Sequence, residues 1–169
     1  ILLMIAGVVL GARLFEVFIY NPGYYLSDPV SIVKVWEGGL SFHGGLAGAI
    51  LAVWFFSRKK GRPGMLELTD MLAMPALGML ALGRMANFIN GELYGGVTTA
   101  GWGVLFSGVE GYRHPVQIYE SFKNLLAFSI LYFVNSFRPA RGVLTCGFLI
   151  TYGAFRFVIE FFKDYGEYG

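Results

Sequence analysis

Polar residues crowd the end of a long apolar segment in this chain. Residues 83–95 read Gly-Arg-Met-Ala-Asn-Phe-Ile-Asn-Gly-Glu-Leu-Tyr-Gly, which places two amides and two charges at Arg84, Asn87, Asn90 and Glu92. Arg84, Asn87 and Gly91 recur at helical i, i+3 and i+7 spacing, so they share one face. Polar groups at bilayer depth are costly and usually face a bundle interior or a wet cavity. Because an arginine fork suits phosphate oxygens, this face predicts an anion site. The alternative is interhelical hydrogen bonding that only fixes packing.

A glycine-rich segment, Ser-Phe-His-Gly-Gly-Leu-Ala-Gly at 41–48, holds the second group. Gly44 and Gly48 form a small-xxx-small pair, which lets two membrane helices approach closely. His43 is the residue of this segment that can exchange a proton near neutral pH. We interpret His43 as a candidate base or proton relay. The alternative is an interfacial histidine satisfied by a carbonyl.

A third group, Tyr152, Arg156 and Glu160, recurs every four residues and lines one helix face. Arg156 and Glu160 could simply form an ion pair that makes both tolerable in lipid. We favour a pair that also presents Arg156 to an anionic ligand.

A fourth group surrounds Pro115, which suits the first turn of a helix. Glu120 complements the dipole of that helix start, and a capped helix entry is one of two interpretations of this group. His114 could contact a ligand or tune the site. Arg13 and Glu16, three residues apart, are ambiguous between these two kinds of role. Asp70, preceded by a threonine, resembles an ordinary helix-start carboxylate.

The elements that must position these groups follow from composition. The chain has 169 residues, 56% of them hydrophobic and 14% charged, whereas soluble domains are about 25% charged. A membrane span needs about 20 mostly apolar residues. Five segments qualify: Ile1–Tyr20, Leu40–Phe56, Leu66–Ile89, Pro115–Val134 and Val143–Phe162. They lack the alternation of barrel strands, so we predict an all-α, polytopic transmembrane helix bundle in a single domain, residues 1–169. Pro75 predicts a kink in the third segment.

The connecting loops predict an orientation. Residues 57–64 and 135–142 are basic and should be cytoplasmic by the positive-inside rule. Residues 21–39 and 91–114 should then face outside. In this arrangement Asp70 lies near the inner side, and nearly all other intramembrane polar residues converge on the outer leaflet. A transporter would be expected to spread polar positions through the midplane, and no internal repeat is visible.

Other chemistries find little support. Two separate histidines without a cysteine cluster argue against a zinc catalyst. The one cysteine, Cys146, cannot form an internal disulfide, and its apolar neighbours predict a packing role. The chain begins without methionine inside an apolar segment, which is typical of a fragment.

Taken together, these residues resemble the prolipoprotein diacylglyceryl transferase family of bacterial membranes. The matching pieces occur in the family's order and cover almost the whole chain: Gly11-Ala-Arg-Leu14; Phe42-His-Gly-Gly-Leu46; Asp70 with Pro75; Gly83 to Gly95; Arg113-His-Pro-Val-Gln-Ile-Tyr-Glu120; and Tyr152-Gly-Ala-Phe-Arg156 with Glu160.

The resemblance implies transfer of the diacylglyceryl group of phosphatidylglycerol to the lipobox cysteine of a preprolipoprotein signal peptide. The products would be a thioether-linked lipid and glycerol phosphate, with no metal or organic cofactor. The family usually has seven transmembrane helices, so this chain would lack the first and last. The protein would lie in the bacterial cytoplasmic (inner) membrane, with its active site toward the outer leaflet. The rival interpretations are a non-catalytic phospholipid-binding subunit and a small transporter.

Residue chemistry then suggests roles within that reaction. Arg84 and Arg156 are expected to bind the phosphate and stabilise it as a leaving group. His43 is the candidate base, with His114 as a weaker second. The remaining predicted substrate-binding residues are Arg13, Asn87, Asn90, Glu92, Tyr152 and Glu160.

Overall fold

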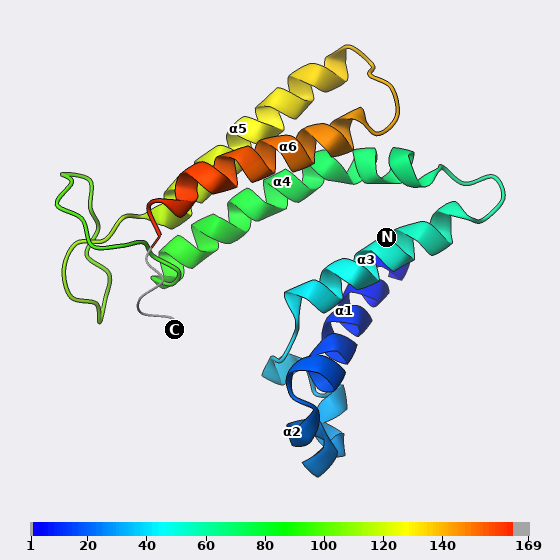
Figure 1. Cartoon of the computed structure of the whole chain (residues 1–169), viewed down its shortest axis with the longest axis horizontal. Helices are drawn as coiled ribbons and strands as arrows, with labels where there is room; N and C mark the ends of the chain where they lie inside the picture. The colour runs from blue at the N-terminus through cyan, green and yellow to red at the C-terminus, as the bar shows by residue number, and fades with distance from the viewer. Residues whose placement is uncertain (1, 164–169) are drawn as a thin grey trace. The chain divides into compact units, whose positions relative to one another are not determined.

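The computed structural model of the chain describes residues 2–163 and confirms the all-α prediction (Figure 1). The α-helices of this part of the chain are α1 (Leu2–Phe15), α2 (Pro22–Ser27), α3 (Phe42–Ser57), α4 (Met65–Asn90), α5 (Val116–Ser136) and α6 (Val143–Glu160). Helical turns of other types occupy Glu16–Tyr20, Pro29–Val33 and Val35–Glu37. The first residue of the first predicted span, Ile1, lies outside the described residues.

Helices stand at all five predicted span positions. Their ends lie within two residues of the prediction when the π-helical turn Glu16–Tyr20 is counted with α1. Three of them are long and apolar enough to cross a membrane: Leu2–Tyr20, Met65–Asn90 and Val143–Glu160. The 16 residues of α3 rise about 24 Å, less than the roughly 30 Å of the hydrocarbon layer. The 21 residues of α5 are long enough, but polar side chains fill its first turns. The count of five spans therefore stays a prediction.

The chain folds as two units, the N-terminal unit (Ile1–Leu68) and the C-terminal unit (Thr69–Gly169), and the single domain stays a prediction. In the N-terminal unit α1 packs directly on α3. A Cβ atom on Gly48 would collide with the carbonyl oxygen of Gly7, and one on Gly44 with that of Gly11. The predicted close approach at Gly44 and Gly48 is confirmed. Gly44 and Gly48 meet Gly11 and Gly7 of α1, a second glycine pair with the same four-residue spacing.

In the C-terminal unit, α4, α5 and α6 share one apolar core, made by Ala73, Leu77, Ala127, Leu131 and Leu144. Helix α4 continues through Pro75 and bends in its first half (Figure 1), which confirms the predicted kink. Proline has no N–H to donate, so the helix loses one hydrogen bond there.

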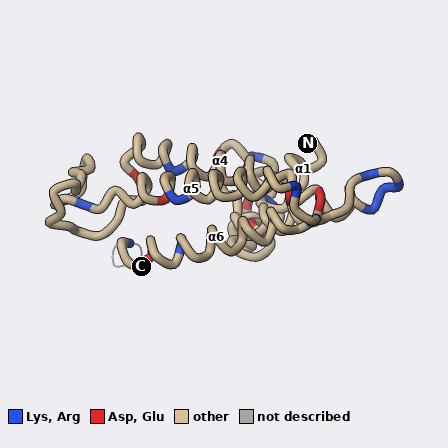
Figure 2. The backbone as a smooth tube through the Cα atoms, turned by 90° about the horizontal axis from the view of Figure 1, so that it is seen from above, with Lys and Arg blue, Asp and Glu red and all other residues tan. Residues whose placement is uncertain are grey.

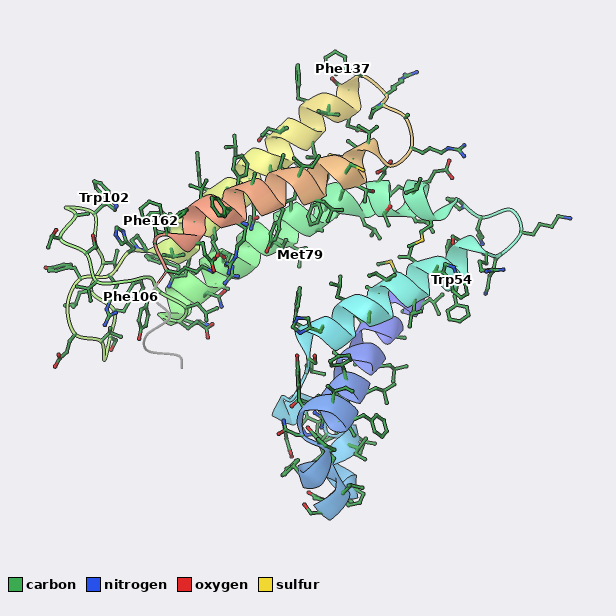
Figure 3. The ribbon with its side chains drawn as sticks, in the orientation of Figure 1. Trp54, Met79, Trp102, Phe106, Phe137 and Phe162 are labelled. Atoms are coloured by element: carbon green, nitrogen blue, oxygen red, sulfur yellow. The ribbon has the colours of Figure 1, made fainter. Side chains whose placement is uncertain are left out.

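The two ends of the C-terminal unit differ in character. At the α5–α6 connection, Asp70 of α4 accepts hydrogen bonds from the main-chain N–H groups of Gly142 (2.6 Å) and Thr145 (2.7 Å). It therefore caps the start of α6, a structural role as expected, but for another helix than its own. Phe137 lies at this end, and Trp102, Phe106 and Phe162 lie at the other (Figure 3).

Two connections carry the features expected from their composition. A run of basic positions occupies the loop between α3 and α4 (Figure 2), and the side of the membrane on which this loop lies stays a prediction. The long 91–114 connection is folded rather than extended, since main-chain hydrogen bonds pair Gly95 with His114 and Val104 with Arg113. Gly95 is confined there, because a Cβ atom would lie 2.6 Å from the carbonyl oxygen of Phe162.

Candidate functional site

One buried carboxylate organises the polar end of the C-terminal unit. Glu120 of α5 is 3% exposed and accepts from Arg84 of α4, from Arg156 of α6 at 2.7 Å and from Lys163 at 2.7 Å. Arg156 also reaches Glu160 at 3.1 Å. Arg84 and Arg156, predicted from separate motifs, are therefore brought together. We call these five residues, with Lys123, the Glu120 cluster.

The α5 face that carries Glu120 is polar over two turns. Gln117, Glu120, Ser121 and Asn124 stand at i, i+3, i+4 and i+7, and all are at most 4% exposed. The Ser121 hydroxyl donates to the carbonyl oxygen of Ala81 on α4 at 3.1 Å. The Gln117 amide donates to the carbonyl oxygen of Glu92 at 2.7 Å. These bonds hold the start of α5 against the end of α4 and fix Glu120 beside Arg84.

The Glu120 cluster carries more positive than negative charge. Arg84, Lys123, Arg156 and Lys163 supply four positive charges, and Glu120 and Glu160 supply two negative ones, an excess of two. The Arg84 and Arg156 side chains remain 26% and 35% exposed. Partly exposed guanidinium groups beside an unbalanced charge favour an anionic ligand with several oxygens.

Tyr152 and Lys123 flank the cluster. The Lys123 ammonium lies 3.8 Å from the centroid of the Tyr152 ring, a cation–π contact between α5 and α6. The Tyr152 ring also stacks on that of Phe148. Tyr152, predicted to bind substrate, thus lies beside the cationic group, and its contact with substrate stays a prediction.

The predicted amide group closes the end of α4. Asn87 and Asn90 donate to the same carboxylate oxygen of Glu92, at 2.9 and 3.1 Å. These two hydrogen bonds, that of Asn87 first, hold the pKa of the Glu92 carboxyl below its ordinary value. The turn needs Gly91 and Leu93 at positive φ, 72° and 57°. The three polar residues therefore lie together, and their role toward a head group stays a prediction.

His114 is held in an aromatic corner. Its Nδ1 lies 3.2 Å from the Tyr119 hydroxyl, which also accepts a hydrogen bond from the Trp102 indole at 2.8 Å. The ring packs edge-on against that of Phe162, with centroids 5.4 Å apart. This corner belongs to the same unit as Glu120. The contact of His114 with substrate, and its role as a second base, stay predictions.

His43 belongs to the N-terminal unit, where it is the second residue of α3, two positions after the N-cap Ser41. Its Nδ1 lies 2.9 Å from the hydroxyl of Tyr20, and the imidazole is exposed. Tyr20 ends a π-helical turn, a widened backbone that turns its side chain toward α3. Sequence spacing does not reveal this phenol partner, because Tyr20 and His43 lie 23 residues apart.

Arg13 is buried in the N-terminal unit with its donors directed at the main chain. Nε and the two amino groups donate to the carbonyl oxygens of five residues: Ser31, Ile32, Lys34, Gly38 and Gly39. A guanidinium has five N–H donors, so each one meets a carbonyl. Arg13 therefore shapes the segment between α2 and α3. Its assignment as a substrate-binding residue stays a prediction.

Two expectations from the sequence need correction. Of the two interpretations left open for the group around Pro115, the capped helix entry does not describe Glu120. It is the centre of the ion cluster, because three cations from beyond its own helix converge on it. Cys146, expected to pack in the core, is exposed on α6.

Comparison with known proteins places these residues in a family context. The family model described as prolipoprotein diacylglyceryl transferase matches residues 1–167. Two relatives are both named phosphatidylglycerol–prolipoprotein diacylglyceryl transferase. The protein from Geobacter sulfurreducens is 48% identical over 94% of this chain and 61% of its own length. The protein from Oleidesulfovibrio alaskensis is 45% identical over 94% of this chain and 60% of its own length. The chain thus spans about three fifths of these relatives.

Proposed function

The chain belongs to the prolipoprotein diacylglyceryl transferase family, and we propose that it carries the centre of an enzyme that lipidates cysteine. The donor is phosphatidylglycerol and the acceptor is the lipobox cysteine of a preprolipoprotein signal peptide. The observation that carries the proposal is the convergence of Arg84 and Arg156 on Glu120 in a cluster with excess positive charge.

The cluster suits the leaving group of this reaction. The cysteine sulfur forms a bond to the glycerol carbon that bears the phosphate, and the carbon–oxygen bond breaks. The departing oxygen keeps the electron pair, so glycerol phosphate leaves with added negative charge. Arg84 and Arg156, held in place by Glu120, stabilise that charge as it develops. Asn87, Asn90 and Glu92 orient the head group from the end of α4.

The reaction also requires removal of the thiol proton, because the thiolate is the nucleophile. His43 takes this proton at its imidazole, with Tyr20 orienting the ring through Nδ1. If His43→Gln kept near-normal turnover at every pH, His43 would be abandoned as the base and His114 would be tested next.

The membrane arrangement supports the same proposal. Within the C-terminal unit, the Glu120 cluster and the basic 137–142 connection lie at opposite ends of the helices. With that connection in the cytoplasm, the site opens at the outer leaflet of the inner membrane. A lipid donor and a membrane-inserted signal peptide both reach such a site by diffusion within the bilayer.

The test incubates the intact protein with phosphatidylglycerol and a lipobox peptide and follows the peptide mass. A mass increase of one diacylglyceryl group on the cysteine, with release of glycerol phosphate, supports the enzyme. Lipid binding without the adduct would instead indicate a non-catalytic phospholipid-binding subunit. Solute flux without either would indicate a transporter.

A further inference from the structure

Lys123 is a buried cation that the proposed chemistry leaves without a role. It is 6% exposed, and its ammonium group is directed at the Tyr152 ring rather than at a carboxylate. Within residues 2–163 it forms no ion pair, although it experiences the charges of Glu120 and Arg156. Burying an unpaired ammonium is costly, so its position requires an explanation.

The stem of Lys123 lines an apolar groove between α5 and α6. The groove has a volume of about 390 Å³, and its walls include Tyr119, Phe122, Lys123, Leu126, Phe155 and Val158. Lysine can bury its methylene stem along apolar surface while its charged end reaches a polar region. Lys123 therefore belongs to both the groove and the Glu120 cluster, and it joins them.

We propose that this groove binds an acyl chain of the donor phospholipid and that Lys123 guides the lipid phosphate toward Arg156. The inference rests on the proposed function for the identity of the lipid. A phospholipid matches both the Glu120 cluster and the groove. Its anionic phosphate complements the excess of two positive charges, and its acyl chain complements the apolar walls.

The geometry along α5 fits this occupant. The groove runs from Ile118, beside Glu120, to Leu126, eight residues further along the helix. Eight residues rise about 12 Å, so the groove leads from the level of the ion cluster toward the middle of the apolar helices. An acyl chain attached to a phosphate at the cluster has to follow the same direction.

The first experiment narrows the groove without touching the cluster. Leu126→Trp is compared with Leu125→Trp, whose side chain is 51% exposed and does not line the groove. With dioleoyl phosphatidylglycerol we expect Leu126→Trp to raise KM about tenfold, the effect of losing contact with one or two methylene groups. With dioctanoyl phosphatidylglycerol both variants should match the wild type. Equal losses with both lipids would overturn the inference and indicate that the groove seats another protein segment.

The second experiment reads binding without turnover. Phosphatidylglycerol with a diazirine in its acyl chain is photo-crosslinked to the intact protein, and the labelled residues are mapped. We expect labels on Leu126, Phe155 and Val158, with fewer labels on Leu125. Lys123→Met should reduce labelling by phosphatidylglycerol toward the level obtained with phosphatidylcholine. Uniform labelling of the exposed residues, or no effect of Lys123→Met, would overturn the inference.

The two proposals fail in different ways. Groove labelling in a protein that forms no cysteine adduct would keep the lipid site and reject the transferase. Adduct formation without groove labelling would keep the transferase and reject the groove as the acyl site.

Discussion

Two regions of the molecule place arginines among apolar helices, and they use them in opposite ways. Arg13 in the N-terminal unit directs its five N–H donors at main-chain carbonyl groups. Arg84 and Arg156 in the C-terminal unit bind a shared carboxylate and remain partly exposed. An arginine saturated by the backbone holds a fold, whereas arginines that share one carboxylate leave positive charge for a ligand.

The two regions also achieve close packing by different means. In the N-terminal unit, glycine pairs bring the backbones of α1 and α3 into contact, which needs no polar group. In the C-terminal unit, polar side chains of α5 bond to α4 and meet charges from α6. We therefore expect charge-conserving substitutions to affect catalysis in the C-terminal unit and stability in the N-terminal unit.

The largest loss of turnover should come from replacing the guanidinium group of Arg84 or Arg156. Arg84→Lys and Arg156→Lys keep the charge but lose the planar donors that match phosphate. We expect turnover to fall on the order of 10²–10³-fold, the usual cost of removing one transition-state donor. Steady-state kinetics with a lipobox peptide measures the change. Arg138→Lys, at an exposed position of the α5–α6 connection, is the matched control. Near-normal turnover in both variants would refute the phosphate assignment.

Glu120→Gln tests whether the carboxylate holds the cluster together. The variant preserves shape but leaves Arg84, Arg156 and Lys163 without their shared anion. Breaking a buried pair costs about 3–5 kcal/mol, and the partial exposure of the arginines favours the lower end. Thermal unfolding in detergent should show the loss, and turnover should fall with it. Glu110→Gln, an exposed carboxylate, should unfold like the wild type; equal behaviour of the two variants would remove Glu120 from the centre of the site.

Arg13→Lys tests the N-terminal unit, where we expect the arginine to stabilise the fold. An ammonium offers three donors in place of five and cannot reach all the carbonyls that Arg13 bonds. We expect stability to fall by about 1.5–3 kcal/mol, the value of hydrogen bonds to a charged group. KM for phosphatidylglycerol should stay within about twofold, well below the tenfold that 1.4 kcal/mol of binding represents. A rise in KM without loss of stability would support the prediction that Arg13 binds substrate.

The smallest effect should come from Glu92→Gln, and it should appear in the stability of the fold. The pKa of this carboxyl is lowered from 4.5 in the folded chain, so its hydrogen bonds stabilise the fold above that pH. The contribution is lost as pH falls through the folded pKa. Unfolding midpoints of wild type and variant should therefore differ slightly at neutral pH and converge in acid. A difference that grows on acidification would contradict the assignment.

The sequence sufficed for features that repeat along one helix. The positions of the five long helices, the Gly44–Gly48 face and the pairing of Arg156 with Glu160 all follow from sequence patterns along one helix. The partners across helices did not follow, because Gly7 and Tyr20 are brought to α3 only by tertiary packing. Glu120 was missed for another reason: a carboxylate at a helix start already has a local explanation.

A signal for the Glu120 cluster was nevertheless present. Gln117, Glu120, Ser121 and Asn124 place four polar residues on one face of a helix, more than a cap requires. Lys163 likewise continues the spacing of Arg156 and Glu160 by one further turn. Spacing alone could reveal these faces, but not that they meet on one carboxylate.

Phosphatidylglycerol affinity tests the central claim most directly. Native mass spectrometry of the intact protein would compare lipid occupancy in the wild type, Arg84→Lys, Arg156→Lys and Arg13→Lys at matched lipid concentrations. We predict affinity losses of about tenfold or more, equivalent to 1.4 kcal/mol, in the two cluster variants and none in Arg13→Lys. Equal affinity in all four proteins, or a loss confined to Arg13→Lys, would contradict the assignment of the phosphate to the Glu120 cluster.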